Sequence, residues 1–256
     1  MTTTGFGYRD RPLNFGHRGE PRAAPENTLA SFQKAREDGA DGVELDVQLC
    51  ADGELVVIHD SSVDRTTNGC GCVRELTLVE LKALDAGSWF GPRFRDERVP
   101  TLREVVEWAG NDVLLDVELK DFSLEDNGLE QKVIALVREC GMGHRVLLSS
   151  FNPLRIWRAK RLAPGVHTGL IYEQGLPIFL RRAWLRLLAR PDALHPEYKM
   201  VTEAYLVWAR RKGYRVNVWA PDHTSEMRRL IAQKVDMIIT NRPDVLATVV
   251  REQELR

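Results

Sequence analysis

Acidic residues recur at a spacing of two within two otherwise apolar segments of the sequence. Glu44 and Asp46 occupy alternate positions in one segment, and Asp116, Glu118 and Lys120 do so in the other. Residues two apart in a β-strand point to the same face, so the charged side chains share one face and the apolar ones share the opposite face. Because the apolar set should pack against helices, the charged set is expected to point into a common interior.

Converging carboxylates of this kind are typical of a metal site. Burying several like charges is unfavourable unless a cation compensates for them. A hard divalent cation held by Glu44, Asp46 and Glu118 would remove the repulsion. The alternative is an ion-pair network in which Arg18 and Lys120 neutralise the carboxylates without a metal. Three carboxylates on two segments favour the metal.

A histidine ends each of two further apolar segments. His17 is followed by Arg18, and His59 is followed by Asp60. Imidazole side chains titrate near neutral pH, so two of them beside carboxylates supply a general acid and a general base. Arg18 and Lys120 add fixed positive charge that suits a phosphate group. A metal, two cations and an acid/base pair together predict phosphoester chemistry.

Short segments rich in β-branched residues alternate with segments of helical periodicity, which is typical of a parallel sheet built from βα units. Eight such units in 256 residues favour a closed (β/α)8 TIM barrel of the α/β class over an open doubly wound sheet. No Gly-x-Gly-x-x-Gly follows the first strand, which argues against a nucleotide-binding open sheet. The expected strands cover residues 13–17, 42–49, 113–119, 145–149, 166–171, 192–195, 215–219 and 236–240.

One segment interrupts this alternation. The Asp52-Gly53 dipeptide predicts a hairpin that adds a partner strand to the second strand. Residues 60–99 then form an insertion over one end of the barrel, with a short helix that starts at the capping box of Thr77 and Glu80. We expect residues 1–256 to form a single barrel domain that carries this inserted subdomain.

The composition is that of an ordinary globular chain, with 36 basic and 37 acidic residues and 43% hydrophobic residues. This balance argues against disorder and against a nucleic-acid partner. No segment approaches the roughly 18–20 apolar residues of a transmembrane helix, and the N-terminus lacks the apolar core of a secretory signal. We therefore expect a cytoplasmic protein without stable membrane insertion. Cys70 and Cys72 lack the spacing of a zinc site, and nothing in the sequence indicates an oligomeric state.

The residues singled out above belong to a longer ordered series of motifs. The series comprises His17-Arg18-Gly19, Pro25-Glu26-Asn27-Thr28, Glu44-x-Asp46, His59-Asp60, Asp64-Arg65-Thr66, Glu118-x-Lys120, Ser150-Phe151, Trp219 and Ile239-Thr240-Asn241. It spans nearly the whole chain and resembles the glycerophosphodiester phosphodiesterases. The resemblance implies a (β/α)8 barrel with a small inserted subdomain, in agreement with the interruption at residues 60–99.

The resemblance also implies a chemistry. It implies a phosphoric diester hydrolase of lipid and glycerol metabolism, which releases an alcohol and sn-glycerol 3-phosphate from a small-molecule glycerophosphodiester. It implies one divalent metal ion, Ca²⁺ or Mg²⁺, with Mn²⁺ as an alternative. The implied roles are metal binding by Glu44, Asp46 and Glu118, acid/base catalysis by His17 and His59, phosphate contacts by Arg18 and Lys120, and packing of Trp219 against the glycerol moiety.

One motif departs from the family pattern. The family often has Trp-Thr-Val-Asn where this chain has Trp219-Ala220-Pro221-Asp222. The loss of the threonine hydroxyl could alter the pocket wall or the choice of substrate.

Two other functions are kept open. The segment 176–190 combines Phe179 and Trp184 with arginines and could rest on a membrane surface. This would fit a lysophospholipase D-type or cyclising phosphodiesterase that acts on lysolipids. We favour instead a barrel helix over residues 177–189 with its apolar face inward and its arginines in water. A non-catalytic ligand-binding barrel is the least favoured function.

Overall fold

The alternating segments form β-strands in the part of the chain that the computed structural model describes, residues 6–121 and 123–254. Their bounds agree with the expected ranges to within two residues, except that the hairpin partner strand is shorter than its expected range 54–59. The strands are β1 (Leu13–His17), β2 (Gly42–Leu49), β3 (Leu55–Val57), β4 (Leu114–Leu119), β5 (Val146–Ser150), β6 (His167–Tyr172), β7 (Ala193–Pro196), β8 (Arg215–Trp219) and β9 (Met237–Thr240).

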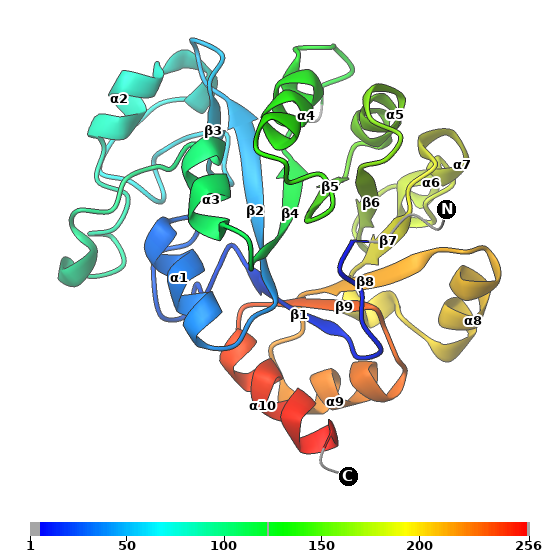
Figure 1. The fold of residues 1–256 in the computed structure, drawn as a ribbon. Helices are drawn as coiled ribbons and strands as arrows, with labels where there is room; N and C mark the ends of the chain where they lie inside the picture. The colour runs from blue at the N-terminus through cyan, green and yellow to red at the C-terminus, as the bar shows by residue number, and fades with distance from the viewer. Residues whose placement is uncertain (1–5, 122, 255–256) are drawn as a thin grey trace.

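The sheet closes on itself. Its strand order is β1-β9-β8-β7-β6-β5-β4-β2, and β1 also pairs with β2, so eight parallel strands form a ring (Figure 1). Strand β3 pairs antiparallel with the carboxyl-terminal end of β2. The expected (β/α)8 barrel is therefore confirmed, and the open sheet is excluded. Helix α2 (Leu78–Ala83) belongs to the insertion. The other α-helices surround the ring: α1 (Leu29–Glu37), α3 (Leu102–Ala109), α4 (Leu129–Glu139), α5 (Pro153–Leu162), α6 (Ile178–Arg181), α7 (Arg186–Ala189), α8 (Glu203–Arg211), α9 (Thr224–Ala232) and α10 (Pro243–Glu254).

Threonine side chains begin several of these helices. The side chains of Thr77 and Thr101 each accept a hydrogen bond from the backbone N–H three residues on, and the glutamate at that position accepts one from the threonine's own backbone N–H, so both form capping boxes. Thr28 caps α1 through its side chain. Each such cap stabilises its helix by about 1 kcal/mol. The capping box that the sequence predicts for the short helix of the insertion is therefore confirmed.

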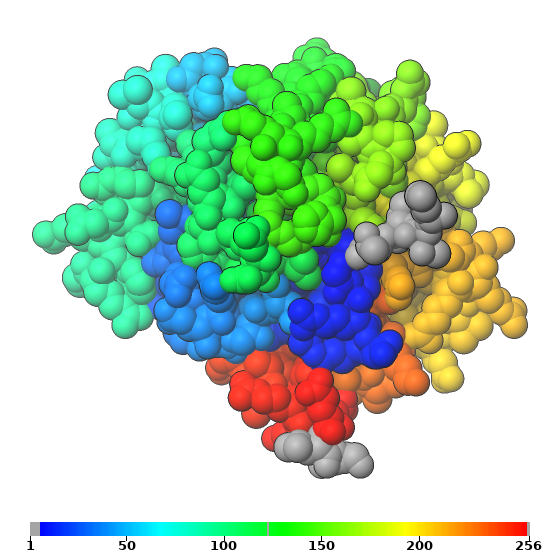
Figure 2. Space-filling view, viewed as in Figure 1, coloured from blue at the N-terminus to red at the C-terminus, as the bar shows by residue number. Residues whose placement is uncertain are grey.

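The interior of the ring is layered along the barrel axis. At its amino-terminal end Phe6, Leu13, Phe15 and Leu147 pack together and close the barrel floor. The described residues from Phe6 onward, dark blue near the centre of Figure 2, lie against this end. Towards the carboxyl ends of the strands the inward-pointing residues become polar and then charged. Functional groups of such barrels gather at that end.

Residues 60–99 pack around a small core of their own. Val63, Val73, Leu81 and Val99 are buried together against residues of β3. Cys70 and Cys72 carry free thiols.

The segment expected to be one helix over residues 177–189 is instead broken in two. Helices α6 and α7 each span four residues, and Ala183 between them adopts a left-handed conformation with φ of 48°. The expectation that its apolar side chains face inward is also wrong, because Trp184 is 54% exposed and Leu187 is 72% exposed. The break at Ala183 prevents one continuous apolar stripe from facing the barrel.

Candidate active site

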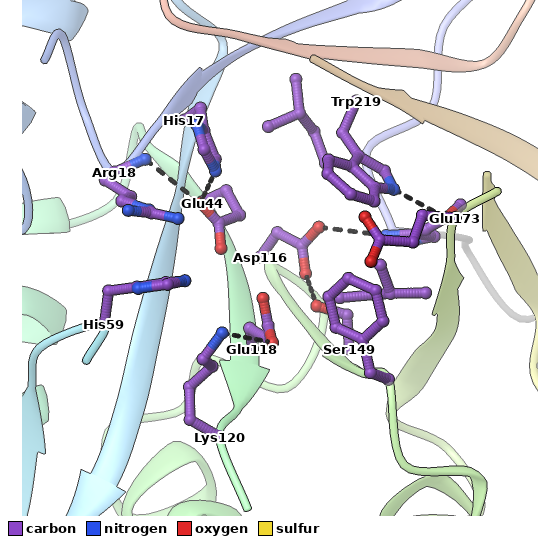
Figure 3. Close-up of a pocket in the computed structure, with 14 residues that line it drawn as sticks. His17, Arg18, Glu44, His59, Asp116, Glu118, Lys120, Ser149, Glu173 and Trp219 are labelled. Carbon is purple, nitrogen blue, oxygen red and sulfur yellow. Dashed lines mark hydrogen bonds and ion pairs between the residues drawn. The ribbon is translucent and has the colours of Figure 1, made fainter. Parts of the chain in front are cut away.

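A cavity of about 220 Å³ opens among the carboxyl ends of the barrel strands (Figure 3). Seven of the eight site residues expected from the sequence line it: His17, Arg18, Glu44, His59, Glu118, Lys120 and Trp219. The eighth, Asp46, belongs to the carboxylate cluster at the cavity wall. The fold therefore brings together residues that are up to 202 positions apart in the sequence.

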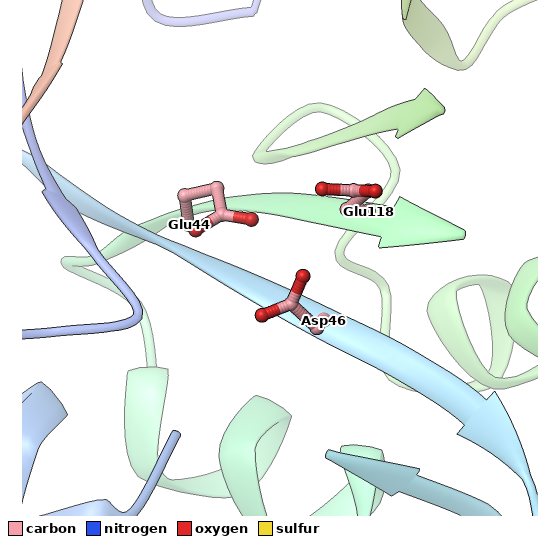
Figure 4. A group of neighbouring side chains, drawn as sticks. All are labelled: Glu44, Asp46 and Glu118. Atoms are coloured by element: carbon pink, nitrogen blue, oxygen red, sulfur yellow. The ribbon is translucent and has the colours of Figure 1, made fainter. Parts of the chain in front are cut away.

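Three buried carboxylates face one another at this wall (Figure 4). Glu44 and Asp46 come from β2 and Glu118 from β4, and Asp46 lies directly opposite Glu118 in the strand register. One oxygen of each lies within 4.8 Å of the others. None of the three residues is more than 7% exposed. The inward orientation that the two-residue spacing predicts is thus confirmed.

The cluster has the chemistry of a cation site. Burial, together with Asp46 and Glu118, raises the pKa of Glu44 well above its usual range, and burial raises the pKa of Glu118 to about 7 despite the nearby Lys120. Burial alone would also raise the pKa of Asp46, but Arg18 and Lys120 lower it. Asp46 Oδ1 is buried and accepts no hydrogen bond. Three hard oxygen donors in one buried cluster, whose negative charge Arg18 and Lys120 offset only in part, fit a divalent cation.

Two cations, Arg18 and Lys120, border the cluster. Arg18 adopts φ of 57°, and its N–H donates to the carbonyl and to Oε2 of Glu44 at 3.0 and 3.1 Å. This turn aims its guanidinium at Asp46, with Nε 3.3 Å from Oδ2. Lys120 Nζ lies 3.0 Å from Glu118 Oε1 and 3.6 Å from Asp46 Oδ1. A bound phosphate would therefore share these cations with the carboxylates.

His17 is oriented by a chain of hydrogen bonds. The Nδ2 group of Asn241 donates to both oxygens of Asp222, at 3.2 and 3.0 Å, so Asn241 Oδ1 faces Nδ1 of His17 at 2.7 Å. Nδ1 must therefore carry the proton, and the basic Nε2 points to the cluster, 3.9 Å from Glu44 Oε2. Burial, aided by Arg18, lowers the pKa of His17 to about 4. His17 is thus neutral at neutral pH, with its Nε2 lone pair free to accept a proton.

His59 has a different partner. Its Nδ1 donates to Asp60 Oδ1 at 2.6 Å, and Arg65 holds the other Asp60 oxygen at 2.6 Å. Arg65 also donates to both oxygens of Glu26. Burial lowers the pKa of His59, while Asp46 and Asp60 oppose this. The two histidines therefore differ in their support, because a neutral amide holds His17 and a carboxylate holds His59.

The opposite wall of the cavity is aromatic. The rings of Phe151 and Trp219 meet edge to face with centroids 5.7 Å apart. Trp219 Nε1 donates to the carbonyl of His195 at 2.9 Å, which fixes the indole. The buried His195 ring fits beside Gly169, where a Cβ would lie only 2.2 Å from its Nε2. Glu173 lies beside Trp219, across the cavity from His59 (Figure 3).

The sequence analysis assigned no function to several residues that the structure places in the site. Asn241 and Asp60 belong to motifs of the ordered series, but nothing in the sequence indicates that they orient the histidines. Asp222, where the family often has asparagine, accepts hydrogen bonds from Asn241 and from Thr240. The departure from the family motif thus supplies the carboxylate that orients Asn241.

Comparisons of the sequence with known proteins point to one family. The sequence profile of the glycerophosphoryl diester phosphodiesterase family matches residues 17–245. A glycerophosphodiester phosphodiesterase of Caldanaerobacter subterraneus subsp. tengcongensis is 42% identical over 94% of this chain and 99% of its own length. One from Bacillus subtilis is 31% identical over 94% of this chain and 87% of its own length.

Solved structures show the same similarity. The glycerophosphodiester phosphodiesterase of Agrobacterium tumefaciens superimposes with a TM-score of 0.81 at 32% identity, covering 93% of this chain and 99% of that one. A phosphodiesterase of Oleispira antarctica, solved in complex with the product sn-glycerol-3-phosphate, gives a TM-score of 0.81 at 32% identity, covering 94% and 97% of the two chains. The chain therefore belongs to the glycerophosphoryl diester phosphodiesterase family and is a phosphoric diester hydrolase.

Proposed function

We propose that the protein hydrolyses glycerophosphodiesters to an alcohol and sn-glycerol 3-phosphate, with His17 and His59 as acid/base pair and one divalent metal ion. The observation that carries this proposal is the single cavity in which both imidazoles border three carboxylates and two cations. A related phosphodiesterase holds sn-glycerol-3-phosphate, which supports a small-molecule diester as the substrate.

Metal binding is attributed to Glu44, Asp46 and Glu118. When bound, a divalent ion such as Ca²⁺, Mg²⁺ or Mn²⁺ supplies Lewis-acid charge near the phosphoryl oxygens. Arg18 and Lys120 border the same place and stabilise negative charge that develops on those oxygens. Trp219, with Phe151 against it, offers a flat apolar surface for the carbon face of glycerol.

The different partners of the two histidines suggest separate roles. His17 presents an unprotonated Nε2 because Asn241 accepts its Nδ1 proton, so His17 takes the proton from the attacking hydroxyl. His59 is backed by the Asp60 carboxylate, which opposes the effect of burial and favours the imidazolium, so in its protonated form His59 donates its Nε2 proton to the departing alkoxide. The bond from phosphorus to the attacking oxygen forms as the bond to the alcohol oxygen breaks.

The attacking hydroxyl belongs either to water or to carbon 2 of the glycerol. In the second case a cyclic phosphate forms first, and water then opens it. The cyclic route requires the 2-hydroxyl, so a substrate in which carbon 2 bears hydrogen instead would be cleaved much more slowly. Equal rates for the two substrates would exclude the cyclic route.

The proposed activity is tested by release of glycerol 3-phosphate from glycerophosphocholine and glycerophosphoethanolamine. Metal-stripped protein is assayed alone and after single additions of Ca²⁺, Mg²⁺ and Mn²⁺. We expect release only with a metal, and its loss in His17→Ala and Glu44→Ala. His144→Ala, which changes an exposed histidine outside the cavity, serves as the matched control. Release by metal-free protein, or by both site variants, would contradict the proposal.

The assignment of acid and base has its own test. An ester of glycerol phosphate with p-nitrophenol needs no proton on its leaving group, because p-nitrophenolate is stable. His59→Ala should therefore cleave this ester nearly as fast as the unchanged enzyme, while His17→Ala should not. The reverse pattern would exchange the two roles.

We also propose that residues 1–256 act as one catalytic domain and that the insertion at 60–99 supports the site. Arg65 of the insertion joins Asp60 to Glu26, next to Arg18. Arg65→Ala should lower kcat for glycerophosphocholine while leaving the rate with the p-nitrophenyl ester nearly unchanged. An equal loss with both substrates would contradict a role through His59.

A further inference from the structure

A patch of exposed apolar side chains lies on the segment between β6 and β7. Phe179 is 45% exposed, Trp184 is 54% exposed and Leu187 is 72% exposed, and Ile178 and Leu188 are about half exposed. The left-handed turn at Ala183 separates α6 from α7 and keeps these side chains from packing on the barrel. Contiguous exposed apolar side chains usually mark an interaction site. We call residues 178–190 the basic-apolar surface.

The charge of this surface is of one sign. It contains Arg181, Arg182, Arg186 and Arg190, and the sequence has no acidic residue between Glu173 and Asp192. Among the described residues no carboxylate forms an ion pair with any of these arginines. Arg186 lies over the Trp208 ring, while the other three offer their charge to a partner.

A groove extends the surface towards α5. It has a volume of about 510 Å³ and lies between α5 and α7, lined by Leu187, Leu188 and Trp157. Lys160 and Arg161 border it as well, and Arg161 stacks on the Trp157 ring. Lys160 is paired with Asp192 at 2.6 Å, so Arg161 is the cation that this groove adds to the surface. Apolar side chains interleaved with cations thus continue from one helix to the next.

The surface begins next to the active site. Ile171 and Glu173 line the catalytic cavity, and α6 starts five residues after Glu173. Helices α6 and α7 lie on the opposite side of the barrel from α2 of the insertion (Figure 1). A partner on the basic-apolar surface would therefore sit beside the segment that forms one wall of the cavity.

We propose that the basic-apolar surface docks the enzyme on a bilayer rich in anionic phospholipids. Arginines with exposed tryptophan, phenylalanine and leucine match the charge and the apolar boundary of such a bilayer. A second copy of the chain is less suitable, because a twofold contact through this surface would bring like arginines together. Docking would place the cavity at the source of lipid-derived diesters, and in this sense the inference rests on the proposed function.

Vesicle flotation tests the inference. The full-length protein is mixed with vesicles of phosphatidylcholine alone or of phosphatidylcholine and phosphatidylglycerol in equal parts, at low and high salt. We expect binding to the anionic vesicles only, weakened by salt, with a blue shift of tryptophan fluorescence. Arg181→Gln with Arg182→Gln should weaken binding at least about tenfold, since each arginine near an anionic surface contributes about fivefold. Trp184→Ser with Leu187→Ser should weaken binding and abolish the blue shift.

Matched changes on the insertion provide the control. Arg74→Gln with Val79→Ser replaces an exposed arginine and an exposed apolar residue of the insertion, far from the basic-apolar surface, and should leave binding unchanged. Every variant should retain the hydrolysis of soluble glycerophosphocholine. Three results would overturn the inference: no binding to anionic vesicles, equal binding to both vesicle types, or self-association that the Leu187 variant abolishes. Vesicle binding by an enzyme that cleaves no diester would support docking while refuting the proposed function.

Discussion

Glu118→Gln in the metal-free protein should increase stability, although it removes a side chain that is proposed to be essential. Glu118 is 7% exposed and faces Glu44 and Asp46 within 4.8 Å. Burial raises the pKa of Glu118 to about 7, even though Lys120 lies 3.0 Å away. The ionised carboxylate is therefore less stable in the folded chain than in the unfolded chain. Glutamine keeps the size of the side chain and has no charge to bury.

The size of the effect follows from the pKa. Raising a carboxyl pKa from 4.5 to about 7 corresponds to a penalty of about 3 kcal/mol at pH above 7, at about 1.4 kcal/mol per pKa unit. The penalty vanishes below pH 4.5, where the carboxyl is protonated in both states. Solvent at the cavity mouth reduces it, so Glu118→Gln should raise the free energy of unfolding by about 1–3 kcal/mol at pH 8 and by less at pH 5.5.

Urea unfolding of metal-free protein at pH 5.5 and pH 8 measures this difference. Adding a saturating divalent ion should then reverse the order. The unsubstituted protein gains about 4.1 kcal/mol at a thousand times its Kd, whereas the variant gains much less.

Glu130→Gln provides the contrasting control. Glu130 is also buried but lies 2.9 Å from the buried Arg155, which would keep only Asp121 as its ionic partner, so removing the Glu130 charge should destabilise the protein by about 1–3 kcal/mol. Destabilisation of metal-free protein by Glu118→Gln at pH 8 would refute the reasoning. That result would indicate that Arg18 and Lys120 alone neutralise the three carboxylates, as in the ion-pair network without a metal.

Three other changes test the hydrogen-bond chain, the packing and a second buried carboxyl. Asn241→Asp places a carboxylate beside His17 and raises its pKa from about 4, so the acidic limb of the pH profile of kcat/KM should move to higher pH. Gly169→Ala puts a Cβ 2.2 Å from His195 Nε2 and should lower stability by about 1–3 kcal/mol in urea unfolding. Burial raises the pKa of Glu20 to about 7, so Glu20→Gln should leave stability unchanged near pH 4 and raise the urea midpoint at pH 8. Unchanged pH profiles or midpoints would contradict the respective arguments.

The sequence by itself determined the barrel and most of its site. The two-residue spacing of Glu44 and Asp46 reports the orientation of a strand, because side-chain direction alternates within the strand itself. The capping box of Thr77 and Glu80 is equally local, since it involves residues within one helical turn. The carboxyl ends of the strands also meet at one face in any closed parallel barrel. The position of His17 at the end of a strand was therefore enough to predict that its side chain lies at that face.

Only the tertiary structure decided how these residues are partnered and what remains exposed. The proton on His17 depends on Asn241, 224 residues away, and the two meet only because β1 pairs with β9. The place of His195 depends on the missing side chain of Gly169 on the neighbouring strand. The helical period of residues 177–189 predicted a buried face, but the turn at Ala183 leaves the apolar side chains in water. Such contacts depend on chain closure and packing, which local periodicity does not encode.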